Sequence, residues 1–295
     1  MIIAGGSGFL GQRLASRLGG GGHQVQILTR TSSGSAHHIA WNPDGTPGSL
    51  ADHFEGAEAV VNLAGATVAR WPWTEKRKEA IRDSRILSTR TIARAIAQCA
   101  KPPKVLVSAS GVHYYGSHGD DPVTESTPPG SDFLARLCVE WEQEARASES
   151  PVTRVCIVRT GLPLSLAGGA FPVMLLPFKL GVAGRLGSGQ QYVPWIHVDD
   201  WTSLVMWLIA NDRARGAFNG AAPGPVTNRE FTTVLGRVVR RPTVLPAPAF
   251  ALRLVLGEMA NLVLIGQRAL PVHGEQLGFR FSYRALEPAL QSLLT

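Results

Sequence analysis

Cysteine is scarce in this chain of 295 residues, which limits both disulfide and metal chemistry. Cys99, Cys138 and Cys156 are odd in number and lack the spacing of a metal site. We therefore expect reduced thiols, no metal and a cytoplasmic location. The start, MIIAGGSG, also lacks a cationic segment before an apolar stretch, which argues against secretion.

Charged residues are few as well, at 17% of the chain, and no cluster of Lys and Arg is interleaved with aromatic residues. The 29 basic and 22 acidic residues nevertheless leave a net charge of +7. Dispersed arginines argue against nucleic-acid binding, and an anionic small-molecule substrate accounts for the positive charge as readily. The oligomeric state stays open at this stage.

Long apolar runs that could form a membrane span are absent too. The longest uncharged run, residues 160–178, has about the length of a span but contains three prolines and a Gly-Gly pair. Such residues break a spanning helix. We therefore interpret the run as a loop and expect no membrane partner.

Short β-branched runs alternate with helical patterns, which is typical of a parallel sheet with crossover helices. The predicted strands span residues 2–4, 25–29, 59–62, 105–109, 155–158 and 216–219, and the predicted helices span 8–18, 75–98, 132–147, 199–210 and 227–239. The fold class is therefore α/β, a parallel sheet with crossover helices, and the Pro- and Gly-rich segments after residue 160 indicate a smaller lobe laid against the sheet.

Three glycines follow the first predicted strand and open the first helix. Gly5 suits a tight turn, Gly8 lets the backbone approach a pyrophosphate, and Gly11 lets the helix pack closely on the strand. A glycine-rich turn without a ligand is the alternative. The position at the first strand–helix junction favours dinucleotide binding.

The carboxylate that holds the ribose of NAD is missing after the second strand. The first acidic residue of the chain is Asp44, whereas Thr29 ends that strand and Arg30, Thr31 and Ser32 follow it. A guanidinium and hydroxyl groups suit a 2′-phosphate, so the pattern predicts NADP. An exposed arginine without a ligand is the alternative for Arg30.

Several motifs together carry a resemblance to a known family. The segments GGSGFLG (5–11), VVNLAGA (60–66), SASGVHYYG (108–116) and WIHVDD (195–200) resemble the extended short-chain dehydrogenase/reductase superfamily. The segments WTEKRKEAIRDSRILSTR (73–90), FNGAAPGPVTNREF (218–231) and GQRALP (266–271) are similar to the epimerase-family proteins of its atypical branch. The resemblance runs almost end to end.

The resemblance implies an NADP(H)-binding protein related to sugar-nucleotide epimerases and dehydratases. It implies an α/β fold, a Rossmann-type doubly wound parallel sheet with a smaller C-terminal substrate lobe. We accordingly predict a dinucleotide-binding domain over residues 1–160 and the substrate lobe over 161–295.

The resemblance implies cofactor contacts at Phe9 and Leu10 beside the glycine loop, at Leu63, Ala64 and Gly65, at Arg85, and at Leu162. It also implies a Tyr-x-x-x-Lys pair, in which the lysine lowers the tyrosine pKa. No tyrosine of this chain has lysine four residues later, and the expected region near Phe133 and Leu137 holds only Arg136.

Catalytic candidates are therefore sought elsewhere. Ser110 stands where the superfamily places its active-site hydroxyl, and Tyr114 follows it, with His113 as the next candidate acid or base. Two functions stay open. The first is an oxidoreductase or epimerase-like enzyme acting on a small metabolite, and the second is a catalytically degenerate NADP(H)-binding sensor or interaction protein.

Three further features allow a structural or a functional interpretation. His197 with Asp199 and Asp200 suits metal or acid–base work, although joining the lobes is favoured. The tryptophans Trp71, Trp73 and Trp195 suit either a ligand cleft or packing of the lobe. Residues 161–192 form a long connection, for which we predict one wall of the substrate cleft, with Arg185 facing an anionic group.

Overall fold

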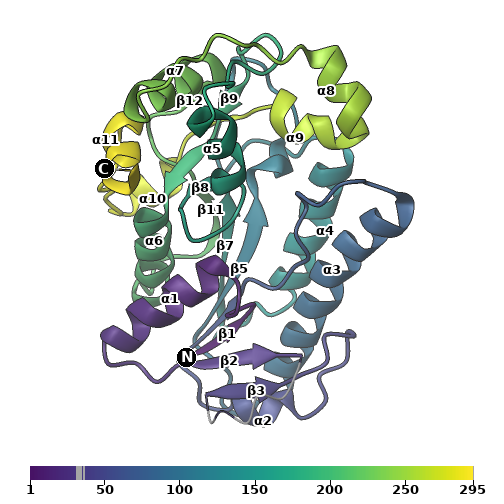
Figure 1. Cartoon of the computed structure of the whole chain (residues 1–295). Helices are drawn as coiled ribbons and strands as arrows, with labels where there is room; N and C mark the ends of the chain where they lie inside the picture. The colour runs from purple at the N-terminus through teal and green to yellow at the C-terminus, as the bar shows by residue number, and fades with distance from the viewer. Residues whose placement is uncertain (31–34, 36, 295) are drawn as a thin grey trace.

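A seven-stranded parallel sheet forms the centre of the molecule (Figure 1). The computed structural model describes residues 1–30, 35 and 37–294. Across the sheet the strands run β11 (Gly216–Gly220), β7 (Arg154–Thr160), β5 (Val105–Gly111), β4 (Ala59–Asn62), β1 (Ile2–Ala4), β2 (Gln26–Thr29) and β3 (His38–Ala40). This order, with the crossover between β1 and β4, is that of a doubly wound fold and confirms the predicted class.

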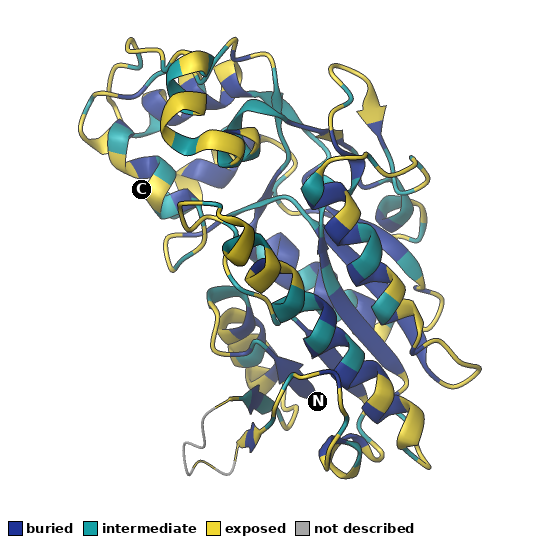
Figure 2. Cartoon of the chain, turned by 90° about the vertical axis from the view of Figure 1, so that its right-hand side faces the viewer, coloured by how far each residue is buried: buried dark blue, intermediate teal, exposed yellow. Residues whose placement is uncertain are grey.

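Helices cover both faces of this sheet. α1 (Phe9–Gly20) and α6 (Val198–Ala210) pack on one face, and α2 (Leu50–Phe54), α3 (Glu75–Gln98) and α4 (Phe133–Arg146) pack on the other. The strands between them are buried along most of their length (Figure 2), as expected for a parallel sheet. The predicted strands and helices of this half are confirmed to within two residues at most ends.

The longest helix illustrates how local sequence sets an element. Thr74 caps α3 by accepting a hydrogen bond from the Arg77 amide at 3.2 Å, and Glu75 lies in the first turn, where a negative charge is favourable. Ile81, Ile92 and the other isoleucines of the helix are buried at helical spacing. The predicted bounds, 75–98, are those observed.

A second group of elements makes the C-terminal lobe. It comprises α5 (Phe171–Lys179), α7 (Asn228–Val238), α8 (Ala249–Leu256), α9 (Asn261–Leu264), α10 (Val272–Gln276) and α11 (Leu286–Leu294), with the short helices η1 (Val112–Tyr115) and η2 (Gly257–Ala260) beside them. Three two-stranded pairs accompany these helices: β8 (Leu162–Leu164) with β10 (Trp195–His197), β9 (Tyr192–Val193) with β12 (Val226–Thr227), and β6 (Pro122–Val123) with β13 (Arg268–Ala269). The lobe has a core of its own, which includes Phe171, Trp195 and Phe231.

Two details of the sequence interpretation were wrong. Of residues 160–178 only residue 161 and residues 165–170 lie between elements, because the others form the end of β7, β8 and most of α5. Pro172 lies in the first turn of α5, where a missing N–H leaves no hydrogen bond unmade. The edge strand β3 was not predicted, since it has three residues and buries only Ile39. None of the described helices is long and apolar enough to cross a membrane.

Candidate functional site

The glycine loop lies at the carboxyl edge of the sheet, between β1 and α1. Gly5 has a φ of 75°, and a Cβ atom there would lie 2.6 Å from the carbonyl carbon of Leu63. A Cβ atom on Gly11 would lie 2.5 Å from the Gly5 oxygen. Only glycine fits at these two positions, because each close neighbour is backbone that cannot move aside. The close packing agrees with the roles that the sequence predicted for these residues.

The first turn of α1 is open to an anion. No side chain caps the helix at Gly8, and no acidic residue lies in its first turn. The amides of Phe9 and Leu10 begin this turn, where helix N–H groups lack partners within the helix. The arrangement therefore fits a pyrophosphate group. Gly168 lies over Phe9, because a Cβ atom there would be 2.8 Å from the Phe9 Cβ.

The end of β2 lies beside this loop. Thr29 is the last residue of β2 and is partly buried, and Arg30 follows it with an exposed side chain. Arg30 forms no ion pair with any residue in the described part of the chain. Thr31 and Ser32, predicted beside it, lie outside the described residues. The guanidinium is thus free to meet a phosphate.

The end of β4 approaches a partly buried arginine. The loop after Asn62 carries Leu63, Ala64 and Gly65, and Arg85 of α3 lies against it, with its Cζ 3.2 Å from where a Gly65 Cβ would be. The Arg85 guanidinium donates to two backbone carbonyl oxygens, those of residues 66 and 81, both at 3.0 Å. Burial lowers the pKa of Arg85 to about 10. Among the described residues no carboxylate pairs with it.

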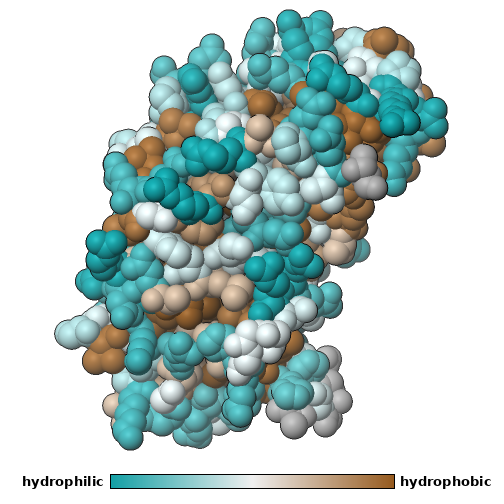
Figure 3. Space-filling model, turned by 90° about the vertical axis from the view of Figure 1, so that its left-hand side faces the viewer, coloured by the Kyte–Doolittle hydropathy of each residue, from teal (hydrophilic) through white to brown (hydrophobic). Residues whose placement is uncertain are grey.

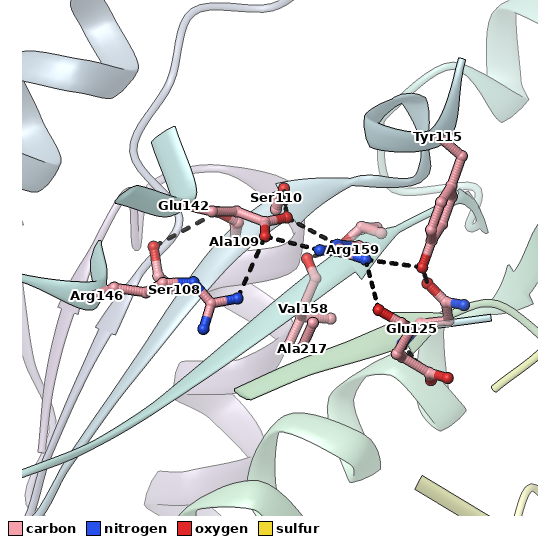
Figure 4. A network of polar contacts seen from close by, with 12 residues as sticks. Ser108, Ala109, Ser110, Tyr115, Glu125, Glu142, Arg146, Val158, Arg159 and Ala217 are labelled. Carbon is pink, nitrogen blue, oxygen red and sulfur yellow. Dashed lines mark hydrogen bonds and ion pairs between the residues drawn. The ribbon is translucent and has the colours of Figure 1, made fainter. Parts of the chain in front are cut away.

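Ser110 belongs to a buried polar network at the end of β5 (Figure 4). Its Oγ donates to Glu142 Oε1 at 2.8 Å, and Glu142 accepts two further bonds from Arg159, at 2.8 and 2.9 Å. The side chains of Glu142 and Arg159 are 4% and 3% exposed. Burial alone would lower the pKa of Arg159, but its hydrogen bonds to Glu142 and its contact with Tyr115 raise that pKa above the ordinary value.

The two tyrosines after Ser110 also contact this arginine. The ring of Tyr114 lies over the guanidinium of Arg159, with 3.4 Å from Cζ to the ring centroid. The Tyr115 hydroxyl donates to Asn219 Oδ1 at 2.7 Å and accepts from Arg159 at 3.0 Å. Burial raises the pKa of Tyr115 to about 12. A tyrosine held protonated in this way acts as a structural anchor in the network.

Leu162, the last predicted cofactor contact, begins β8 directly after the carboxyl end of β7. Its amide donates to the Pro194 oxygen at 2.7 Å, so the chain is held against β10 at this point. A Cβ atom on the preceding Gly161 would lie 1.8 Å from that same oxygen. Glycine is therefore required where the chain leaves the sheet.

A cavity of about 1060 Å³ lies between the sheet domain and the C-terminal lobe. Its wall comes from α3, from His113 of η1, from the start of α4 and from residues 258–267. Lys78 of α3 bridges the lobes through an ion pair with Glu258 at 2.5 Å. Neither Ser110 nor Tyr114 is among the lining residues, whereas His113 is. Burial lowers the pKa of His113, so its imidazole is neutral at neutral pH.

The segment 161–192 does not line this cavity. Arg185 lies instead in a second cavity of about 530 Å³, with Arg229 and three threonines. The expectation of a wall therefore fails for the larger cavity. The reason is that β8 and α5 pack Phe171 and Leu175 into the core of the lobe, while Gly168 between them lies over Phe9 at the glycine loop.

His197 and its two aspartates join the lobes, as favoured from the sequence. The His197 ring stacks on Tyr283 with 3.9 Å between centroids, and its Nδ1 accepts from the Asp199 amide. Asp200 accepts from the backbone amides of Ser282 and Tyr283 at 2.9 and 2.8 Å. No group of three metal-binding side chains occurs within residues 1–30, 35 and 37–294.

The three tryptophans divide between packing and cavity. Trp195 is completely buried in the core of the lobe and donates to the Gly224 oxygen at 3.0 Å. Trp73 lines the interlobe cavity, and its ring meets that of Phe133 edge-on. Trp71 is 58% exposed. Trp195 is thus a packing residue, and only Trp73 is placed to contact a ligand in that cavity.

Comparison with known proteins decides the family. The model of the NAD dependent epimerase/dehydratase family matches residues 1–220, and a domain of unknown function, DUF1731, matches residues 247–293. The chain belongs to the NAD dependent epimerase/dehydratase family. It is 40% identical over 294 residues to the epimerase family protein MT2273 of Mycobacterium tuberculosis, covering 98% of this chain and 96% of that protein.

Two further relatives of this epimerase-family chain are informative. The chloroplastic SDR39U1 homolog of Arabidopsis thaliana is 39% identical over 300 residues, which cover 99% of this chain and 86% of that protein. The crystal structure of human epimerase family protein SDR39U1 (isoform2) with NADPH matches with a TM-score of 0.92 and 32% identity, covering 99% and 98% of the two chains. The resemblance stated from the motifs is confirmed.

The start of α4 carries an ionisable pair that the sequence interpretation missed in this epimerase-family chain. Asp132 and Arg136 are four residues apart and both line the interlobe cavity with His113. Asp132 caps α4 by accepting from the Ala135 amide at 2.9 Å. The pair has the spacing of the family's Tyr-x-x-x-Lys motif. The sequence carries this signal, because Asp132 and Arg136 each stand one residue before Phe133 and Leu137, the positions expected for the motif.

Acid is expected to destabilise this epimerase-family protein through two histidines. Burial lowers the pKa of His113 and of His197, so both are neutral when folded, whereas in the unfolded chain each takes up a proton near pH 6.5. For each histidine, the unfolded state therefore binds more protons than the folded state at any pH between the lowered folded pKa and the unfolded pKa. The free energy of unfolding consequently decreases as pH falls through about 6.5. Urea unfolding at about pH 7.5 and about pH 5.5 measures the loss.

A pair of variants separates these histidines from other titrating groups. His113→Asn should reduce the loss of stability between the two pH values, and the control His53→Asn, at an exposed position of α2, should leave it unchanged. An undiminished pH dependence in the His113 variant would assign it to other residues.

Proposed function

We propose that this epimerase-family protein is an NADP(H)-dependent oxidoreductase or epimerase-like enzyme that acts on an unidentified small metabolite. The observation that carries the proposal is the start of α1 beside Arg30, which has no side-chain cap and no acidic residue in its first turn. The carboxyl edge of the sheet, where α1 begins, faces the interlobe cavity. NADPH in the crystal structure of human SDR39U1 supports the choice of cofactor. When bound, the cofactor supplies or takes up a hydride.

The proposed cofactor contacts follow the chain along this edge. The backbone at Gly5, Gly8, Phe9, Leu10 and Gly11 holds the pyrophosphate, and Thr29 with Arg30 meets the 2′-phosphate. Leu63, Ala64 and Gly65 line the ribose, and Leu162 lies beside the nicotinamide end. Arg85 supports the loop at Gly65 and brings a positive charge without a paired carboxylate, which favours the anionic cofactor.

We propose His113 as the acid or base of the reaction. It lines the interlobe cavity, and its neutral imidazole can accept a proton. Ser110 and Tyr114 remain predictions as catalytic residues. The Ser110 proton is already donated to Glu142, and the face of the Tyr114 ring is occupied by Arg159.

The cavity suits a polar, anionic substrate. Among the described residues, the Arg136 guanidinium donates only to the backbone oxygen of Ser131. Most of its N–H groups are therefore available to a carboxylate or phosphate. Trp73 and Phe133 supply an apolar surface next to it. The proposed domain division at residue 160 assigns the opposite wall, residues 258–267, to the substrate lobe.

The second candidate is an NADP(H)-binding sensor or interaction protein without turnover. The observation in its favour is that Ser110 is bonded to Glu142 and that no tyrosine–lysine pair is present. Both candidates bind NADPH. They differ in whether a metabolite is consumed. We further propose a cytoplasmic location, which the three free cysteines support.

The test begins with incubation of the protein and NADPH in a metabolite extract, followed by mass spectrometry to find a compound that is consumed. With that compound, His113→Asn should lower turnover by about a hundredfold, the usual contribution of general acid–base catalysis, and leave NADPH affinity unchanged. Arg185→Ser, outside this cavity, is the matched control.

Three other results would change the assignment. NADPH binding without any consumed compound would establish the sensor alternative. A turnover insensitive to His113→Asn but lowered by Ser110→Ala or Tyr114→Phe would return the catalytic role to those residues. Absence of NADPH binding would refute both candidates.

A further inference from the structure

A helix of the C-terminal lobe has seven apolar residues and one arginine yet buries none of them. α8 reads AFALRLVL, and its side chains at Phe250, Leu254 and Val255 are 74%, 85% and 64% exposed. A helix that is hydrophobic all round is normally buried in a core. A surface of this kind marks an interaction site.

The exposed apolar surface continues from α8 across the lobe. The backbone of residues 245 and 247 donates to the oxygens of residues 183 and 185, at 3.3 and 2.9 Å, and so joins the segment before α8 to the segment after α5. We define the basic apolar surface by its exposed side chains Val173, Leu176, Leu180, Val182, Val244, Leu245, Phe250, Leu254 and Val255. Val173, Leu176 and Leu180 at α5 recur at spacings of three and four, and Phe250 and Leu254 of α8 are four residues apart, so each of these sets lies on one face of its helix.

The segments that carry this surface are basic, and two carboxylates at their edge are paired, Glu258 with Lys78 and Glu287 with Arg237. Residues 166–191 and 231–257, which form it, contain six basic residues and no Asp or Glu. Lys179, Arg240, Arg241 and Arg253 are exposed. None of these four forms an ion pair with another described residue. Figure 3 views the molecule from the side opposite to that of α8 in Figure 1 and shows hydrophobic and hydrophilic side chains interleaved over the upper end of that face.

A cavity beside the surface has the same character. Arg185, Arg229 and three threonines line a space of about 530 Å³ that also reaches Val244. Both arginines donate to the Ser188 oxygen, at 3.1 and 3.5 Å, and no carboxylate lines the space. Guanidinium and hydroxyl donors without an acid suit a phosphate group.

We propose that the basic apolar surface docks on an anionic lipid bilayer. An apolar helix with basic neighbours lies in the interface of such a bilayer, with its side chains among the acyl chains and its cations at the phosphates. The cavity of Arg185 and Arg229 then receives a lipid phosphate. The sequence analysis expects no membrane partner because it finds no segment that could span a bilayer, and none of the described helices could cross one. A helix that lies on the bilayer surface does not need to span it.

The charge favours a bilayer over a second copy of the chain. In a two-fold contact each copy presents the same patch to the other. Arg240, Arg241 and Arg253 would then meet the same cations of the partner, with no Asp or Glu in residues 166–191 or 231–257 of either copy. Like charges in an interface disfavour association. An anionic bilayer supplies the missing negative charge.

The test is co-sedimentation of the full chain with vesicles of phosphatidylcholine alone, or of phosphatidylcholine mixed with phosphatidylglycerol. We expect binding to the mixed vesicles, weakened by added salt, and little binding to the neutral ones. The variant Arg240→Ser/Arg253→Ser should bind about 25-fold more weakly, at about fivefold for each charge removed. Phe250→Ser/Leu254→Ser should abolish binding.

Matched controls lie on the opposite end of the molecule. Val152→Ser changes an apolar side chain that is 59% exposed, and Arg213→Ser removes an exposed arginine, so both should leave vesicle binding unchanged. All variants should have the NADPH affinity and the circular dichroism spectrum of the unaltered protein. A change in vesicle binding can then be attributed to the surface and not to unfolding or to loss of the cofactor site, which keeps this test separate from the proposed function. Absence of vesicle binding, or equal binding to neutral vesicles, would overturn the proposal. So would a dimer that Phe250→Ser/Leu254→Ser dissociates.

Discussion

Replacing Arg159 with methionine is expected to lower the free energy of unfolding by about 3–5 kcal/mol. The substitution leaves the carboxylate of Glu142, which is 4% exposed, without its bidentate partner inside the protein. It also removes the donor to the Tyr115 hydroxyl and the cation under the Tyr114 ring. Urea unfolding at neutral pH, extrapolated to water, measures the change.

An exposed ion pair provides the matched control for this result. Arg284 and Glu275 lie 2.7 Å apart, with side chains 56% and 33% exposed. Solvent screening limits such a pair to about 0–1 kcal/mol, so Arg284→Met should change stability little. A loss at Arg159 no greater than that of the control would mean that solvent reaches Glu142 and that the network does not stabilise the end of β5.

Replacing Arg30 with alanine is expected to reduce the preference for NADPH over NADH by roughly tenfold to a hundredfold. A charge-assisted contact to the 2′-phosphate contributes about 1.5–3 kcal/mol, and no Asp or Glu follows β2 in the chain before Asp44 to favour a free ribose hydroxyl. The side chain is exposed and forms no ion pair among the described residues, so its removal should leave folding intact. Calorimetric titration with both cofactors measures the two affinities.

The variant Arg13→Ala serves as a control, because Arg13 of α1 is already paired with Asp199. It should leave the ratio of the two affinities unchanged. Equal affinity of the unaltered protein for NADPH and NADH would refute the assignment of Arg30, and so would an Arg30→Ala variant that keeps the full preference.

The local signals of the cofactor half could be read because each depends on near neighbours in the chain. Gly11 is required by the Gly5 carbonyl oxygen within the same turn between β1 and α1, and the bounds of α3 follow from its cap and its isoleucines. The interlobe cavity could not be read in this way. Its wall combines His113 and Asp132 with residues 258–267, which are distant in sequence.

The sequence by itself determined three features: the alternation of strands and helices, the glycine loop suited to a pyrophosphate, and the absence of a carboxylate directly after β2. Each is a property of a short segment of the chain. Only the tertiary structure decided which polar groups are buried and paired. Ser110 and Arg159 became partners of Glu142 because β5, β7 and α4 pack together. The same packing left α8 uncovered, and burial depends on what the rest of the chain places against a segment, which no local pattern contains.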